Sequence, residues 1–76
     1  MSEKIPDCIS FGEAVRRERS RQGYSQEAFA RQAGIHRTYL GGLERGERNP
    51  TLVTMVKIAR ELGIELDELF RSRDAS

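Results

Sequence analysis

This chain is poor in several of the residue types on which disulfide-bonded folds and membrane proteins depend. Its 76 residues include a single cysteine and no tryptophan. Cys8 therefore has no partner for a disulfide within the chain, which fits the reducing cytoplasm, where we expect the protein to act. No apolar run approaches the roughly 20 residues that a membrane-spanning helix needs. Lys4 precedes only Ile5-Pro6-Asp7, which is unlike a signal peptide, so we expect no association with membranes.

The chain also has little to offer an enzyme. Its one histidine, His36, lies twenty-eight positions from Cys8, and the two residues fall on different expected elements. Together they provide no base, nucleophile or set of metal ligands with suitable spacing. No glycine-rich phosphate-binding loop is present. We therefore expect no enzymatic activity, no bound metal and no other cofactor.

Charge is nearly balanced overall but unevenly distributed along the chain. The formal net charge is +1, from 13 basic and 12 acidic residues. Residues 36–60 carry five basic and two acidic residues, a net of +3, whereas residues 61–76 carry two and five, a net of −3. The positive middle suits a polyanionic partner, and the acidic end would then face away from it. Polarity this modest also suits an ordinary solvated surface, so charge alone leaves both interpretations open.

The most informative stretch is residues 34–46, which has a glycine at each end. Leu40 and Leu43 lie three positions apart, so they share one side of a short helix. If His36 is the N-cap, Ile35 precedes the cap and Leu40 is the fourth helical residue, which is the spacing of a hydrophobic staple. The pattern predicts a short helix with one firmly buried side.

The opposite side of this short helix is unusually bare. Arg37 and Thr38 lie at its front, and Gly41 and Gly42 follow on the side away from the leucines. Two adjacent glycines inside a helix cost about 1 kcal/mol each relative to alanine. Close approach of the helix backbone at these glycines to a bulky partner would compensate for that cost. We interpret the segment as the recognition helix of a helix-turn-helix DNA-binding domain.

Two further helices are expected before this segment. Ser10 and Glu13 have the spacing of a capping box, which predicts a first helix over residues 11–22. Ser25 is the expected N-cap of a second helix, which ends at Gly34. Only about three residues then separate the second helix from the third, so the two helices must cross at a steep angle.

Two more helices are expected after it, and no strand pattern occurs. Thr51 is the expected N-cap of a fourth helix that ends at Gly63, and residues 64–70 form a short fifth helix. The chain would then divide into a flexible N-terminal arm over residues 1–9, one helix-turn-helix DNA-binding and dimerisation domain over residues 10–71, and a frayed tail over residues 72–76.

Five residues in the second and third helices recur at the offsets of a known family: Gln26, Ala30, Gly34, Leu40 and Leu43. In this pattern the chain resembles the phage-repressor (Cro/Xre-like) helix-turn-helix family, over about four-fifths of its length. The resemblance implies an all-α fold, a five-helix bundle of the lambda-repressor-like type. Three shorter matches are similar to controller proteins of restriction-modification systems: Arg37-Thr38-Tyr39-Leu40, Gly42-Leu43-Glu44-Arg45 and Arg48-Asn49. Controller proteins are small dimeric regulators that activate or repress their own promoter and that of the endonuclease.

The resemblance also implies which side chains contact double-stranded DNA. Arg37 would read a guanine through its forked guanidinium, and Thr38 would meet a thymine methyl group or a phosphate. Contacts to the DNA backbone, or to its shape, are expected from seven residues: Ser25, Gln26, Tyr39, Arg45, Arg48, Asn49 and Thr54. The chain departs from the common family pattern at Gly41, where serine is frequent, and at His36, where serine, threonine or aspartate is the usual cap.

Two other groups of residues have expected structural roles. By the family pattern, Arg19 and Glu44 form a partly buried ion pair that joins the first helix to the end of the third. Apolar residues in excess of what so small a core can use are expected to form a homodimer interface: Val53, Leu66, Leu69 and Phe70. A two-fold dimer would place two recognition helices about 34 Å apart, facing half-sites with inverted symmetry.

Alternatives to the controller hypothesis remain open at this point. A general Xre-family repressor would carry the same motif, and so would the DNA-binding antitoxin of a toxin–antitoxin pair, which would co-purify with a small toxic partner. Activation of transcription would require an exposed patch that contacts RNA polymerase. The sequence does not distinguish such a patch from ordinary surface charge, so it does not decide between activator and repressor.

Overall fold

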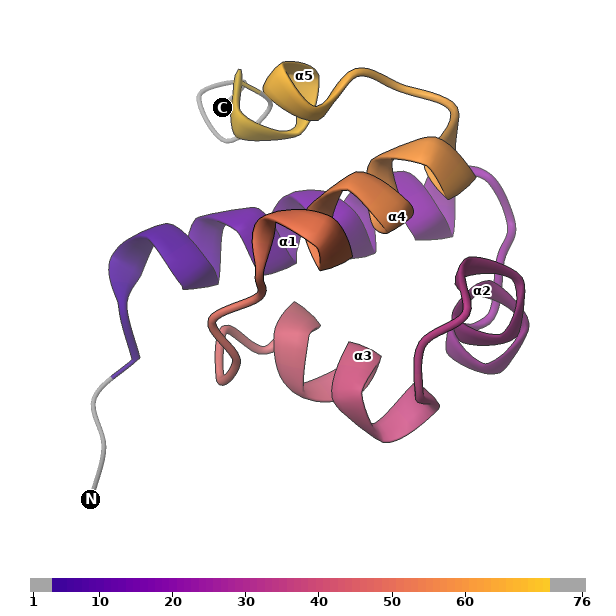
Figure 1. Ribbon diagram of the computed structural model, residues 1–76, viewed down its shortest axis with the longest axis horizontal. Coiled ribbons are helices and arrows are strands. Elements are labelled where there is room, and N and C mark those ends of the chain that lie inside the picture. Colours follow the sequence, from indigo (N-terminus) through magenta and orange to yellow (C-terminus); the bar gives the residue numbers. More distant parts are fainter. Residues whose placement is uncertain (1–3, 72–76) are drawn as a thin grey trace.

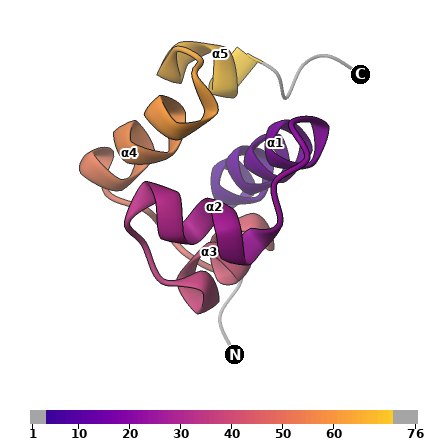
Figure 2. The same ribbon diagram turned by 90° about the vertical axis from the view of Figure 1, so that its right-hand side faces the viewer.

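The computed structural model describes residues 4–71, which form five α-helices (Figure 1). The helices are α1 (Pro6–Arg21), α2 (Gln26–Ala33), α3 (Arg37–Glu44), α4 (Leu52–Leu62) and α5 (Leu66–Arg71). In Figure 1 the long helix α1 runs through the middle, with α3 below it and α5 above it. In Figure 2, α1 and α4 lie on opposite sides, with α5 above them and α2 and α3 below. No strand occurs among residues 4–71, so the expected all-α five-helix fold is confirmed.

The expected start of the first helix is wrong. The helix begins at Pro6, five residues before the predicted Phe11, and Ser10 lies inside it. Pro6 occupies the first helical position, where its fixed φ suits a helix and its missing N–H is no loss. The side chain of Ile9 also packs against Gly46 at the end of α3, which holds the first turn in place. The predicted arm over residues 1–9 therefore overlaps a helix from Pro6 onward, while residues 1–3 and the predicted tail over residues 72–76 lie outside the described residues.

Gly12 is where α1 approaches α3 most closely. A Cβ atom at this position would collide with the backbone carbonyl oxygen of Leu43 and would lie 2.9 Å from that of Glu44. Backbone oxygens at the end of a packed helix cannot move aside as a flexible side chain can. The absence of a side chain at Gly12 therefore sets the distance between α1 and the C-terminal end of α3.

One hydrophobic core joins all five helices. Its members are Phe11, Ala14, Val15, Phe29, Ala30, Leu40, Leu43, Ile58, Ala59, Leu62 and Leu69. Phe29 from α2 and Leu40 from α3 are fully buried, and they lie on the facing sides of two helices that are separated by three residues. The small side chain of Ala30 permits this close crossing, because a larger residue there would hold the helices apart.

Leu69 is not part of the apolar surface left over from the core, which corrects the expectation for α5. Its side chain is fully buried, and Leu66 is half-buried against the core. Phe70 is 38% exposed and stacks on Phe11 with 5.3 Å between ring centroids. The most exposed large apolar residue among those expected at a dimer interface is Val53, at 65%.

The helix ends follow the sequence signals more closely than the start of α1 does. Ser25 and Thr51 act as N-caps, since their hydroxyls accept hydrogen bonds from the backbone N–H groups of Ala28 and Thr54. Gly34 ends α2 with a φ of 75°, a left-handed conformation that glycine adopts without a steric penalty. Of the helices in residues 4–71, none combines the length and the apolar character that crossing a bilayer requires.

Candidate nucleic-acid interface

Two polar side chains at the N-terminal end of α3 have no bonding partner in the part of the chain that the structure describes. His36 caps the helix through its backbone conformation alone, with no hydrogen bond from its side chain. Arg37 and Thr38 follow and are both exposed. Across residues 4–71, neither side chain has a hydrogen bond or an ion pair. The two residues expected to contact bases are thus presented on a helix whose other side, at Leu40 and Leu43, is fixed in the core.

The back of α3 is held by a network of charged hydrogen bonds, and the expected ion pair is its centre. Arg19 donates from Nε to Oε2 of Glu44 at 2.6 Å and from Nη2 to Oε1 at 3.0 Å. Its Nη1 donates to the backbone oxygen of Tyr24 at 2.7 Å. The Arg19 and Glu44 side chains are only 10% and 2% exposed. A forked, two-bond contact of this kind is the strongest geometry available to an arginine and a carboxylate.

Gln26 belongs to the same network. Its side-chain nitrogen donates to Oε1 of Glu44 at 2.9 Å, so the amide lies across the ends of α2 and α3. Of the backbone N–H groups in the first turn of α2, that of Ala28 donates to the Ser25 hydroxyl, and the first N–H groups of a helix have no acceptor within the helix. The expected binding of a phosphate at this N-terminus stays a prediction.

The two glycines of α3 lie under arginines of the same chain. Gly41 and Gly42 are both buried. A Cβ at Gly41 would meet the tip of Arg45, and a Cβ at Gly42 would meet the middle of the Arg48 side chain. The predicted close approach of DNA to these glycines stays a prediction, and the space above them is filled in the free protein by Arg45 and Arg48.

The chain after α3 places two arginines, Arg45 and Arg48, against these glycines. Arg45 donates from Nε to Oε2 of Glu47 at 3.1 Å. This hydrogen bond and the accompanying charge attraction hold the pKa of Glu47 below its ordinary value and raise the pKa of Arg45. Arg48 lies over the ring of Tyr39, with its guanidinium carbon 5.6 Å from the ring centroid. Asn49 is exposed next to it.

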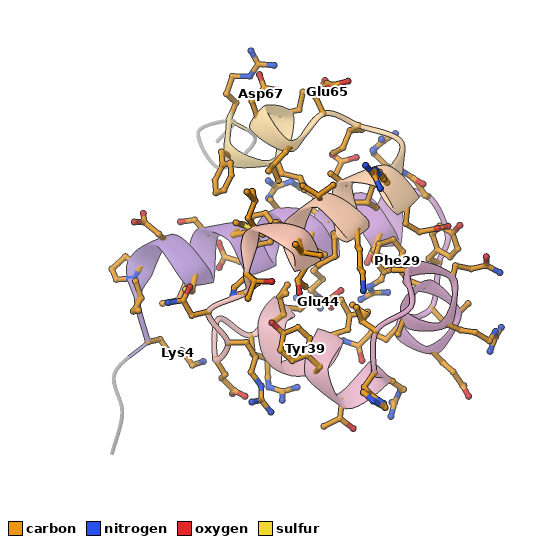
Figure 3. The ribbon with its side chains drawn as sticks, viewed as in Figure 1. Lys4, Phe29, Tyr39, Glu44, Glu65 and Asp67 are labelled. Carbon is orange, nitrogen blue, oxygen red and sulfur yellow. The ribbon has the colours of Figure 1, made fainter. Side chains whose placement is uncertain are left out.

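A basic groove extends this surface along α1. It has a volume of about 820 Å³, and Gln26, Gly41 and Arg45 line it together with α1 residues. The α1 side contributes Arg16 and Arg17, and Lys4 lies at one end of the groove. Figure 3 shows Lys4 on the segment before α1, on the same side of the molecule as α3 and Tyr39. Two acidic residues, Glu13 and Glu44, also line the groove.

The sequence predicts that Arg16 and Arg17 are solvated, with at most one of them reaching a phosphate. Arg16 and Ser20 follow Gly12 at intervals of four and so share its side of α1, but periodicity does not show that this side faces α3. Thr54, which was expected at the DNA backbone, lies in the first turn of α4, where its hydroxyl accepts a hydrogen bond from Thr51 at 3.1 Å.

Comparison with known proteins agrees with this geometry. The helix-turn-helix family matches residues 15–69 of the chain. The control protein C.MunI of a Mycoplasma species is 44% identical over 63 residues, which are 82% of this chain and 85% of that protein. The control protein C.SmaI of Serratia marcescens is 44% identical over 59 residues, which are 78% of this chain and 70% of that protein. The crystal structure of the restriction-modification controller protein C.AhdI from Aeromonas hydrophila superimposes with a TM-score of 0.83 at 45% identity, covering 86% of this chain and 98% of that one.

Two packed helices with a three-residue turn, the second of them with one side in the core and a polar front, define a helix-turn-helix DNA-binding domain. The chain belongs to the helix-turn-helix family of transcriptional regulators, and its relatives include the control proteins of restriction-modification systems. These relatives are regulators rather than enzymes, in agreement with the expectation that the chain has no enzymatic activity.

Proposed function

We propose that this protein is a restriction-modification controller that binds inverted-repeat operators as a homodimer, regulates its own promoter and times expression of the endonuclease. The observation that carries this proposal is the front of α3, where Arg37 and Thr38 are exposed and unheld while Leu40 is locked in the core. Such a helix can enter a major groove without changing its own packing. A regulator of this kind acts in the cytoplasm, where its operators are.

Arg37 and Thr38 are the proposed base contacts. An arginine at the front of a recognition helix can donate two hydrogen bonds to O6 and N7 of one guanine, and no other base pair offers that pair of acceptors. Thr38, one residue further along, carries both a methyl and a hydroxyl group, which suit the methyl of a thymine or a phosphate oxygen. Together the two residues would read adjacent positions in each half-site.

Phosphate contacts are proposed from two groups of residues around α3. The first group is the N-terminus of α2 at Ser25 and Gln26 together with Arg16, Arg17 and Arg45, which line the groove along α1. The second group follows the helix in the chain and consists of Arg48, Asn49 and Thr54. Tyr39 lies beneath Arg48. Contacts to both strands would fix the orientation of α3 in the groove without carrying sequence information of their own.

The homodimer is proposed through the exposed apolar residues of α4 and α5. Leu52 and Val53 are 63% and 65% exposed, and Phe70 is 38% exposed. Burying large apolar side chains against a second copy of the chain is favourable, because it removes their apolar surface from water. None of these three residues is a proposed DNA contact, and Thr54, which is one, follows Val53 directly in α4. A protein that sediments as a monomer at micromolar concentration would contradict this part of the proposal.

The central test is selection of duplexes from a random pool at moderate ionic strength, followed by footprinting on the DNA upstream of the protein's own gene. We expect the selected sequences to be inverted repeats with half-sites one helical turn apart, and the footprint to cover such a repeat. Protein that shows no preference among random duplexes would refute sequence-specific binding. An inverted repeat found only at unrelated promoters, or a small toxic protein that co-purifies, would favour a general repressor or an antitoxin.

The phosphate assignments are tested separately by the salt dependence of binding. If each protomer neutralises three or four phosphates, log K against log salt should have a slope of about −5 to −7 for the dimer. Replacing Arg16 with alanine should make the slope shallower by about 2 per dimer, because one phosphate contact is lost from each protomer. A slope near zero in the wild-type protein would contradict the whole set of phosphate contacts.

A further inference from the structure

Gly42 occupies a position on α3 that the Arg48 side chain covers. A Cβ at Gly42 would lie 3.1 Å from Nε and 3.2 Å from Cγ of Arg48, both of which are in the middle of that side chain. No other atom would come within 3.7 Å of it apart from the helix itself and the adjacent residues. The space that a Cβ at Gly42 would need is therefore occupied by the Arg48 side chain.

Tyr39 is the second residue against which the Arg48 side chain lies, and we refer to Gly42 and Tyr39 together as the seat of Arg48. Positions 39 and 42 lie three apart on a helix, so they face the same way. The guanidinium carbon of Arg48 lies 5.6 Å from the centroid of the Tyr39 ring, within the range of about 6 Å for a cation–π contact. Arg48 thus rests on bare backbone at one point and on an aromatic face at another.

The neighbouring pair, Gly41 and Arg45, is different. The nearest atom to a Cβ at Gly41 would be the terminal Nη1 atom of Arg45, at 3.3 Å, followed by the amide of Gln26 at 3.8 Å, and a terminal atom can move easily. Arg45 is held by its hydrogen bond to Glu47 instead. Within residues 4–71, Arg48 has no salt bridge of its own, and its charge interacts with Glu47 only at longer range. The contacts that place Arg48 against α3 are those with Gly42 and Tyr39.

We propose that Gly42 and Tyr39 are positioning residues for Arg48. The glycine is needed for an arginine of the same chain, not for the DNA backbone, and the two residues together hold Arg48 against the outer face of α3 before DNA arrives. This inference rests on the proposed function, since a fixed Arg48 matters only if this face of α3 meets DNA. Holding the side chain in advance lowers the loss of side-chain entropy when it makes its contact.

The seat itself can be tested without DNA, by NMR of the free protein. A side chain that lies over an aromatic ring has its proton resonances displaced upfield by the ring current. We expect the δ-protons of Arg48 to be displaced in the wild-type protein and in Tyr39→Phe, which keeps the ring. In Tyr39→Leu and Gly42→Ala the displacement should be lost or reduced. In Gly41→Ala, which adds the same methyl group one position earlier, it should remain.

A double-mutant cycle on the affinity for operator DNA then tests whether the seat acts through Arg48. Gly42→Ala should weaken operator binding by about two- to fivefold, the affinity equivalent of an exposed cation–π contact. In a protein that already carries Arg48→Ala, the same substitution should have less than half of that effect, because the side chain that Gly42 positions is gone. Tyr39 is left out of the cycle because it is itself an expected DNA contact. Gly41→Ala should have the same effect, whatever its size, with and without Arg48.

The possible outcomes separate this inference from the proposed function. An undisplaced Arg48 resonance in wild-type protein overturns the seat, whatever happens with DNA. An equal loss of affinity from Gly42→Ala with and without Arg48 also overturns it, because the added methyl group then meets the DNA directly. If no variant, including the wild type, binds any duplex, the proposed function fails, and the NMR result still decides whether Arg48 is held by Gly42 and Tyr39.

Discussion

The two ends of α3 differ in what holds their side chains. At the front, Arg37 and Thr38 are exposed and have no bonded partner among residues 4–71. At the back, Glu44 is buried and accepts hydrogen bonds from two other elements, through Arg19 and Gln26. A helix built in this way has one end that is available for a partner and one end that is fixed to its own domain. Substitutions at the back should therefore change stability, whereas substitutions at the front should change binding and leave stability as it is.

The largest effect is expected from Glu44→Ala, which removes the carboxylate from the fixed end. Arg19 would then be left nearly buried with no counter-charge, at a cost of about 3 to 5 kcal/mol in the free energy of unfolding. Chemical or thermal unfolding followed by circular dichroism measures this loss directly. Glu47→Ala, at an exposed carboxylate in the following loop, is the matched control and should leave the melting temperature almost unchanged. An unchanged melting temperature in Glu44→Ala would mean that the back of α3 is not held by this pair.

Gly12→Ala should act on the same end from the side of α1. The added methyl group meets the carbonyl oxygens of Leu43 and Glu44, so the helices must separate, which costs about 1 to 3 kcal/mol or more. Ala14 and Val15 next to it are already buried in the core, so there is no free volume into which α1 can shift. Ser20→Ala, further along the same helix on an exposed position, is the control for helix propensity. If Gly12→Ala is as stable as wild type, the close contact between α1 and α3 is not tight in solution.

Arg37→Ala should weaken DNA binding and leave stability unchanged, because Arg37 lies at the exposed N-terminal end of α3. Its loss should cost about 1 to 3 kcal/mol of operator binding for each contact and relax the preference at one base position in each half-site. The melting temperature should not fall, since the side chain has no partner within the described chain. Arg60→Ala, which removes an exposed charge from α4, is the control for a general change in net charge. A drop in stability without a change in base preference would reverse the roles that we assign to the two ends.

The smallest effect on stability is expected at the exposed Arg45–Glu47 ion pair, which follows α3 in the chain. Because Arg45 holds the pKa of Glu47 below its ordinary value, the pair contributes above the ordinary pKa of a glutamate and is lost as the pH falls through the lowered pKa. In Arg45→Ala the pKa of Glu47 should return toward its ordinary value, which an NMR titration of the carboxyl group measures. Both groups are exposed, so no measurable change in unfolding should accompany it. An identical Glu47 titration in both proteins would show that this pair does not form in solution.

Much of the fold could be predicted from the sequence because its signals are local. The Ser25 and Thr51 caps, the left-handed Gly34 and the three-residue spacing of Leu40 and Leu43 each depend on residues within one turn of each other. Local geometry of this kind survives in almost any tertiary setting. The start of α1 was misplaced for the same reason. Two local signals competed there, a proline at residue 6 and a capping box at Ser10, and only the packing of Ile9 against Gly46 decides between them.

The candidate interface was only partly predictable. Arg37 and Thr38 could be placed at the front of α3 from helical periodicity, and the resemblance to a known family indicated the Arg19–Glu44 pair. The positions of Arg16 and Arg17 beside α3 could not be found in this way, because they depend on how closely α1 approaches α3 at Gly12. The covering of Gly42 by Arg48 was also out of reach, since it depends on the path of a loop after the helix. Leu69 was expected at a surface for a related reason, because hydrophobicity alone does not tell a core residue from an interface residue.

The sequence by itself determined that the chain forms five helices with no strand pattern, and which side of α3 is apolar. Those properties follow from spacing and from cap residues, which act over three or four positions. The tertiary structure decided the contacts between residues that are distant in the chain or that lie on a helix and the loop after it. It brings Arg19 to Glu44 across twenty-five positions, places Arg48 on Tyr39 and Gly42, and buries Leu69. The physical reason is that a contact between distant residues depends on how whole helices pack, and the side chains at the contact do not encode that packing on their own.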